Sequence, residues 1–250
     1  MFSPHTRCTS EQAPFHLLHG DPHIYEQIGD YSFRISPESF FQVNTEGARV
    51  MYDTVSKLLN PSKMTTVMDI CCGTGTQGLM VARRVRGVVG IELSRLAVLD
   101  ARYNAQLNKI HNTEFYPGRV EKLFQPVTEQ LSLATEISAI VNPSRAGVRK
   151  SFALHEINSS MLINVNDGYV SNHSDPKLIQ LIRENDRIRR LVYVSCQPDG
   201  PAMKNFVDLV KANEKRNHKN TNEPFQLKKI VPVDMFPHTD HCEMVLLFQR

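Results

Sequence analysis

A thiol and a carboxylate stand at the ends of apolar, strand-like runs near the carboxyl end of the sequence. Cys196 follows the run LVYVS, and Glu243 stands near the start of HCEMVLLFQ. An antiparallel strand begins where its parallel neighbours finish, so we expect both side chains to face one crevice. A thiolate there can act as a nucleophile and a carboxylate can accept a proton. Taken alone, each has a plainer interpretation, as a small buried cysteine and a solvated glutamate.

The stretch DICCGTGT, residues 69–76, closes an earlier strand with an acid and turns into a helical pattern. Gly73 and Gly75 let the backbone approach a ligand without a Cβ in the way. Glu92 ends the next strand, where a carboxylate can accept both hydroxyls of a ribose. The loop lacks a third glycine for a dinucleotide, and S-adenosylmethionine carries a ribose without a pyrophosphate. The loop therefore predicts S-adenosylmethionine as cofactor, although Asp69 has the alternative role of fixing the turn amides.

Together, these groups suit the transfer of a methyl group to carbon 5 of a uracil. Addition of the Cys196 thiolate to carbon 6 makes carbon 5 nucleophilic, and Glu243 can later remove the carbon 5 proton so that the thiol leaves. Arg145, in the segment NPSRAG after another strand-like run, can hold a uracil carbonyl or a phosphate and help to keep the thiol ionised. We therefore predict Cys196 and Glu243 as catalytic residues and Arg145 as a substrate-binding residue.

Short apolar runs alternate with helical patterns from residue 65 onward. The predicted parallel strands are residues 65–70, 87–93, 113–118, 137–143 and 191–196. Near-continuous apolar strands separated by helices are typical of a parallel sheet covered on both faces. The last two runs, 227–236 and 241–249, have a link that is short enough only for an antiparallel return. The sequence thus predicts an α/β fold of the Rossmann-like S-adenosylmethionine-dependent methyltransferase type, with a mainly parallel seven-stranded sheet and a C-terminal antiparallel β-hairpin.

Two segments lie outside this alternation. Residues 45–59 read as an amphipathic helix, with Thr45 as its N-cap and Asn60-Pro61 as its stop. Residues 149–176 are rich in Asn and Ser without a sustained period, which predicts a long loop or insertion. The predicted organisation is an N-terminal extension over residues 1–30 and a methyltransferase domain over residues 31–250.

Composition limits the classes of partner. The 250 residues are 41% hydrophobic and 22% charged, which is typical of one large globular domain. A formal net charge of +3 is too small for general polyanion binding, so contact with nucleic acid requires a local patch. The five cysteines form no CxxC pair, and no apolar run approaches the length of a membrane span. We expect a monomer with reduced thiols, without a metal site or a membrane partner, and leave its compartment open between nucleus, cytosol and mitochondrion.

Six segments in a fixed order carry a family resemblance. They are FRISPESFFQVNTEGA, DICCGTGTQGL, GIEL, NPSRAG, VYVSCQPDG and FPHTDHCEMVLLF. They resemble the RNA 5-methyluridine methyltransferases, in particular the eukaryotic tRNA (uracil-5-)-methyltransferase 2 homologues of A or B type. The resemblance implies Cys196 as nucleophile, Glu243 as proton acceptor and a flipped uridine at position 54 of the tRNA T loop as target. It also implies that S-adenosylmethionine is lined by Gln42, Cys71, Thr76, Glu92 and Asn142.

The NPSR segment departs from the family pattern. The family usually has [ND]PPR, whereas Ser144 precedes Arg145 here, and residues 149–176 follow almost at once. Two other enzymatic interpretations are methylation of cytosine carbon 5 and amino methylation. The first usually has a second cysteine where Ser144 stands, and the second an aromatic residue where Arg145 stands. An RNA-binding or RNA-folding module that has lost catalysis is a third alternative.

Overall fold

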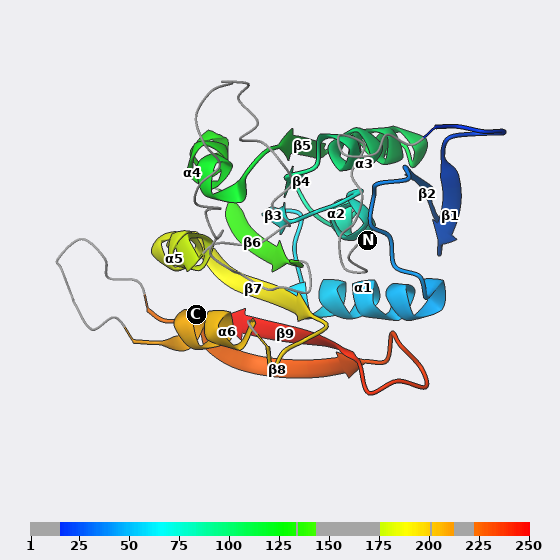
Figure 1. Cartoon of the computed structure of the whole chain (residues 1–250). Coiled ribbons are helices and arrows are strands. Elements are labelled where there is room, and N and C mark those ends of the chain that lie inside the picture. The colour runs from blue at the N-terminus through cyan, green and yellow to red at the C-terminus, as the bar shows by residue number, and fades with distance from the viewer. Residues whose placement is uncertain (1–15, 134, 144–175, 201, 213–222) are drawn as a thin grey trace, which may run out of the picture.

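A computed structural model of the chain describes residues 16–133, 135–143, 176–200, 202–212 and 223–250, in which nine strands and six helices are found (Figure 1). The strands are β1 (Ile24–Ile28), β2 (Tyr31–Ile35), β3 (Thr65–Ile70), β4 (Gly87–Glu92), β5 (Thr113–Pro117), β6 (Glu136–Val141), β7 (Ile188–Ser195), β8 (Gln226–Val233) and β9 (Glu243–Gln249). The helices are α1 (Thr45–Leu59), α2 (Thr76–Ala82), α3 (Arg95–Leu107), α4 (Val120–Gln130), α5 (Pro176–Glu184) and α6 (Ala202–Val210).

Seven strands form one sheet in the order β5-β4-β3-β6-β7-β9-β8. The strands from β5 to β7 run parallel, while β9 lies antiparallel between β7 and β8. This confirms the predicted mainly parallel sheet with its C-terminal antiparallel hairpin. The chain order reverses between β3 and β6, and in open sheets of this kind ligands bind at such a switch point, beyond the carboxyl ends of the strands.

Helices cover both faces of this sheet. Helices α1, α2 and α3 lie on one side in Figure 1, and α4, α5 and α6 lie on the other. Successive strand residues feed two separate hydrophobic cores, so that Val67 and Ile140 join the first, and Met68 and Ala139 join the second. Burial on both faces explains why these strands read as continuous apolar runs.

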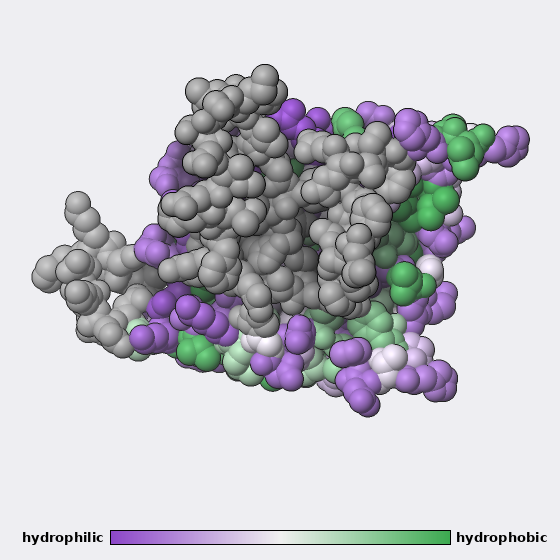
Figure 2. Space-filling model, viewed as in Figure 1, coloured by the Kyte–Doolittle hydropathy of each residue, from purple (hydrophilic) through white to green (hydrophobic). Residues whose placement is uncertain are grey.

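The β1–β2 hairpin forms a separate two-stranded sheet that the sequence analysis did not predict. Gly29 opens its two-residue loop with φ of +58°, a left-handed conformation that favours glycine. Phe33 is fully buried in the core shared with α1, α2 and α3. By contrast, Ile24 and Val43 are 63% and 88% exposed, and Figure 2 shows hydrophobic surface on this side of the molecule. Strand β1, which lies within the predicted extension, thus pairs with β2 across the residue 30 boundary.

Helix α1 has the predicted range but a different cap. Its N-cap is Asn44, whose Oδ1 accepts a hydrogen bond from the Gly47 N–H at 2.9 Å, so the prediction of Thr45 as the N-cap is wrong. The Asn44 side-chain amide also donates a hydrogen bond to the Met235 carbonyl at 3.3 Å. The shorter threonine hydroxyl could not make both hydrogen bonds. The helix ends at Leu59, and its C-cap is Asn60, with φ of 40°, which confirms the predicted stop at Asn60-Pro61.

Candidate active site

The carboxyl ends of β3, β4 and β6 bring several of the predicted site residues to one edge of the sheet. Cys71 follows β3, and its N–H donates to the Ile91 carbonyl at 2.9 Å. Asn142 follows β6, and its N–H donates to the Ile70 carbonyl at 3.3 Å. Glu92 is the last residue of β4. The three residues therefore stand side by side at the switch point of the sheet.

Cys196 and Glu243 lie at the same edge of the sheet, at the ends of two paired strands. The last antiparallel pair between β7 and β9 joins Ser195 to Met244. Cys196 is the residue after Ser195, and Glu243 is the residue before Met244. Glu243 is buried, and Cys196 is partly exposed. A thiol and a carboxylate thus lie at the same edge of the sheet.

Glu92 holds the glycine loop in place. Its two carboxylate oxygens accept hydrogen bonds from the N–H groups of Gly73 at 3.0 Å and Ser94 at 2.9 Å. Each carboxylate oxygen can accept more than one hydrogen bond. Gly73 has φ of +53°, and a Cβ built there would meet no atom of the described residues within 4 Å. Among those residues, the loop therefore leaves space beside a buried carboxylate, an arrangement that suits the ribose of the expected cofactor.

Asp69 lies buried beneath this loop. Its Oδ2 accepts a hydrogen bond from the Gly78 N–H at 2.8 Å, so it does fix a turn amide. Its Oδ1 has no partner among the described residues, and neither has either atom of the buried Gln77 amide. Burial, opposed by the Gly78 N–H and reinforced by the charge of Glu92, raises the pKa of Asp69 to about 7. Since buried polar atoms are nearly always paired, the described residues leave hydrogen-bonding capacity beside the glycine loop unused.

Two polar groups near this edge, the Cys71 thiol and the Tyr52 hydroxyl, have raised pKa values. Burial, followed by the charges of Glu92 and Asp69, raises the pKa of the Cys71 thiol well above its usual range, so this thiol is neutral. Its backbone takes a left-handed φ of 63°. Tyr52 of α1 was missed in the sequence: burial and then the charges of Asp69 and Glu243 raise its pKa. Tyr52 is packed in the core near these two carboxylates. A tyrosine in an amphipathic helix carries no sequence signal that it lies near them.

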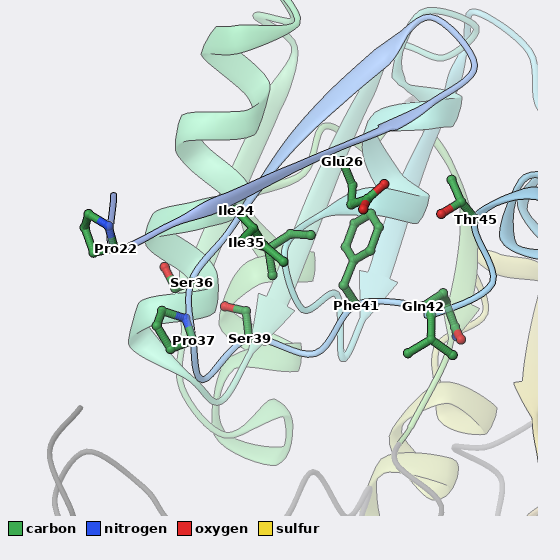
Figure 3. Close-up of a pocket in the computed structure, with 11 residues that line it drawn as sticks. Pro22, Ile24, Glu26, Ile35, Ser36, Pro37, Ser39, Phe41, Gln42 and Thr45 are labelled. Atoms are coloured by element: carbon green, nitrogen blue, oxygen red, sulfur yellow. The ribbon is translucent and has the colours of Figure 1, made fainter. Parts of the chain in front are cut away.

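Gln42 lies on the segment that leads from β2 to α1, and its side chain is buried. It lines a cavity of about 570 Å³ between the β1–β2 hairpin and residues 36–45 (Figure 3). The other lining residues are Pro22, Ile24, Glu26, Ile35, Ser36, Pro37, Ser39, Phe41, Val43 and Thr45. None of these lining residues belongs to the glycine loop or to the carboxyl ends of β3, β4 and β6, so the cavity is separate from the loop.

The same segment reaches the β8–β9 hairpin. Asn44 donates its side-chain hydrogen bond to the carbonyl of Met235, and a Cβ built at Gly47 would come within 3.0 Å of the Met235 sulfur. Val233, two residues earlier, pairs directly with Glu243. The start of α1 therefore lies close to the strand that carries the candidate base.

Thr76 begins α2, is buried and has its hydroxyl 3.0 Å from that of Thr74. Arg145 and nearly all of the predicted insertion lie outside the described residues. Within the part of the chain that the structure describes, no cluster of His, Cys, Asp and Glu could hold a metal ion. No helix in that part is both long and apolar enough to cross a membrane.

Comparison with known proteins decides the family. The family model described as tRNA (Uracil-5-)-methyltransferase matches residues 24–250. The chain belongs to this family. The resemblance predicted from the six sequence segments is thus confirmed.

Within the tRNA (uracil-5-)-methyltransferase family, similar relatives are considerably longer. The chain is 42% identical over 245 residues to tRNA (uracil-5-)-methyltransferase homolog B of Danio rerio. This match covers 98% of this chain and 45% of the relative. It is also 42% identical over 242 residues to homolog A of Mus musculus, covering 97% of this chain and 34% of the relative. The chain spans less than half the length of these relatives.

A solved structure supports the same fold. The Pyrococcus abyssi tRNA (uracil-54, C5)-methyltransferase, in complex with S-adenosyl-L-homocysteine, matches with a TM-score of 0.60 and 26% identity. The match covers 92% of this chain and 45% of that one. The predicted Rossmann-like methyltransferase fold is confirmed.

Proposed function

We propose that this domain transfers a methyl group from S-adenosylmethionine to carbon 5 of a uridine in tRNA, with position 54 of the T loop as its target. The observation that carries the proposal is the antiparallel pairing of β7 and β9, which ends at Ser195 and Met244, so that Cys196 and Glu243 follow this pair at one edge of the sheet. Both stand at the edge of the sheet that also holds the glycine loop. Family membership and the named substrate of the Pyrococcus protein support the choice of tRNA and of position 54.

The residues around the glycine loop fit S-adenosylmethionine. Within the part of the chain that the structure describes, the space beside Gly73 provides room, and the carboxylate of Glu92 and the atoms of Asp69 and Gln77 without a partner there provide hydrogen-bonding groups. When bound, this cofactor supplies a methyl group on a positively charged sulfur. The residues that we propose to hold it are Gln42, Cys71, Gly73, Thr76, Glu92 and Asn142.

The chain's own chemistry begins with Cys196. Its Sγ forms a bond to carbon 6 of the uracil, and the electron pair of the carbon 5–carbon 6 double bond shifts toward carbon 5 and the carbon 4 carbonyl. Carbon 5 thereby becomes able to accept a methyl group. We further propose that Arg145 holds a uracil carbonyl or a phosphate by charge-assisted hydrogen bonds.

Glu243 then completes the reaction. Its carboxylate removes the proton from the methylated carbon 5, the C–H electron pair restores the ring double bond, and Sγ departs from carbon 6. Carbons 5 and 6 are adjacent in the ring, which suits a thiol and a base carried to one edge of the sheet by two neighbouring strands. Because Glu243 is buried, bulk water has little access to this proton transfer.

Methyl transfer to a tRNA transcript tests the proposal. The protein is incubated with tRNA and S-adenosylmethionine that carries a labelled methyl group, and we expect the label on carbon 5 of a uridine. Cys196→Ala should lower turnover at least about a thousandfold, since it removes the nucleophile. Cys242→Ala is the matched control, because this cysteine adjoins Glu243 but has no role in the mechanism. Full turnover by Cys196→Ala would sink the mechanism, and a 5-methylcytidine product would favour the cytosine alternative.

A further inference from the structure

Helix α3 presents a row of buried polar side chains to the outer edge of β2. Four helical residues rise about 6 Å and two strand residues span about 6.6 Å, so every fourth helical residue can serve every second strand residue. The row consists of Asp100, Asn104 and the C-cap Asn108. Asn108 bonds the N–H and carbonyl of Ser32 (2.9 and 2.7 Å), Asn104 those of Arg34 (2.7 and 3.1 Å), and Asp100 the N–H of Ser36 (2.9 Å). These side chains take the place of a neighbouring strand.

Asp100 also reaches beyond the end of the strand. Its Oδ1 accepts hydrogen bonds from Arg34 Nε and Ser36 Oγ, each at 2.9 Å, and its Oδ2 accepts one from Ser39 Oγ at 2.8 Å. The turn itself is closed by the Ser39 N–H, which donates to the Ser36 carbonyl at 2.9 Å. This single, fully buried carboxylate therefore fixes the turn from which the chain continues to Gln42.

The same helix also contacts the glycine loop. Asn104 Nδ2, besides bonding β2, donates to the Thr74 carbonyl at 3.2 Å. A Cβ built at Gly75 would lie 3.0 Å from the Cβ of Ala101, so the loop backbone lies directly against α3. One face of α3 is thus the common support of the glycine loop and of the segment that follows β2.

We propose that Asp100 is a positioning residue for cofactor binding: it holds residues 36–42, and with them Gln42, in a fixed place relative to the glycine loop. This inference rests on the proposed function, because it takes Gln42 as a cofactor contact. The aromatic contact of Phe41 with Phe33, with ring centroids 5.8 Å apart, holds the end of the segment beside Gln42 against the core. Asp100 holds its start, so Gln42 is placed by both ends, and releasing the start loosens its position without removing a cofactor contact directly.

Binding of S-adenosylhomocysteine, measured by calorimetry, tests this role. Asp100→Asn keeps the size of the side chain but puts an N–H₂ group against the donors of Arg34, Ser36 and Ser39. We expect its Kd to rise about tenfold or more, the scale of loss that small displacements of binding groups cause. Ser39→Ala removes a single bond at the far end of the turn and should raise the Kd less. Asn108→Ala is the matched control, because it breaks the same row without a contact to residues 36–42.

A double-mutant cycle separates positioning from general loosening. If Asp100 acts through the turn, the effects of Asp100→Asn and Ser39→Ala on the Kd are not additive. A Kd for both variants equal to that of the wild type, or an equal loss of affinity in Asn108→Ala, overturns the inference. A wild type that binds S-adenosylhomocysteine but methylates no tRNA overturns the proposed function and leaves the comparison of variants intact. A wild type that binds none overturns both.

Discussion

At the scale of single residues, the proposed role of Glu243 as the base can be isolated from that of Cys196 as the nucleophile. Removing the base leaves adduct formation possible but blocks its resolution, so Glu243→Gln should accumulate a covalent complex with tRNA. Denaturing gel electrophoresis after incubation with S-adenosylmethionine and tRNA detects that complex. Turnover should fall by about 10²–10⁴, the usual contribution of a positioned base. The double variant with Cys196→Ala should give no complex, and turnover of Glu243→Gln close to the wild type would contradict the assignment.

Asp69 gives the folded protein a defined pH dependence. Its pKa rises from 3.8 to about 7 on folding, chiefly through burial, so the folded protein keeps this proton where the unfolded chain has released it. The contribution of Asp69 to the free energy of unfolding therefore falls as pH rises from about 4 to about 7, by at most about 4 kcal/mol. Asp69→Asn cannot ionise and can still accept from the Gly78 N–H. Urea unfolding near pH 5 and near pH 8 should show the variant gaining stability relative to the wild type at the higher pH; an unchanged difference would refute this.

At the scale of elements, the cap of α1 can be tested by two neighbouring substitutions. Asn44→Ala removes the hydrogen bond from Gly47 and the one to Met235, and should lower the free energy of unfolding by about 1–2 kcal/mol. Thr45→Ala, one residue on, is the control, and its effect should stay within about 0.5 kcal/mol. Urea unfolding at constant pH measures both. A larger loss of unfolding free energy in Thr45→Ala than in Asn44→Ala would contradict Asn44 as the N-cap and favour Thr45.

Strands that are buried on both faces could be predicted from the sequence, whereas the β1–β2 hairpin could not. Strand β3 is buried at all six positions, so its apolar run is unmistakable. Strand β1 is exposed at four of its five positions, because only its last residue, Ile28, is buried in the core, and its residues therefore show no clear period. The one available signal was Gly29-Asp30 between two short runs, a recognised hairpin turn.

Some residues in and around the candidate site could likewise be predicted from the sequence, and others could not. Cys196, Glu92 and Glu243 could be placed because a parallel sheet gathers its strand ends at one edge, whatever its side-chain packing. Asp100 and Asn104 could not, since polar residues four apart on a helix look like a solvated face. Only the position of β2 shows that this face is buried and bonded to a strand edge.

At the scale of the whole molecule, the proposed cofactor site joins distant parts of the chain. The segment with Gln42 precedes the sheet, the glycine loop and Glu92 lie in its first half, and Asn142 follows the switch to β6. A ligand that contacts all of them binds only the folded chain. Its free energy of binding therefore adds to the stability of the whole fold and not to one element.

S-Adenosylhomocysteine should accordingly raise the Tm of the protein. At a concentration one hundred times its Kd, a ligand specific for the folded state adds about 2.7 kcal/mol. For a domain of this size that corresponds to a rise in Tm of about 5–10 °C, which thermal unfolding at several ligand concentrations measures. NAD at equal concentration is the control and should give no rise, because the loop lacks a pyrophosphate-binding turn. Glu92→Gln should lose most of the rise, since its amide cannot accept both ribose hydroxyls while also holding Gly73 and Ser94. A rise with NAD and none with S-adenosylhomocysteine would overturn the cofactor assignment.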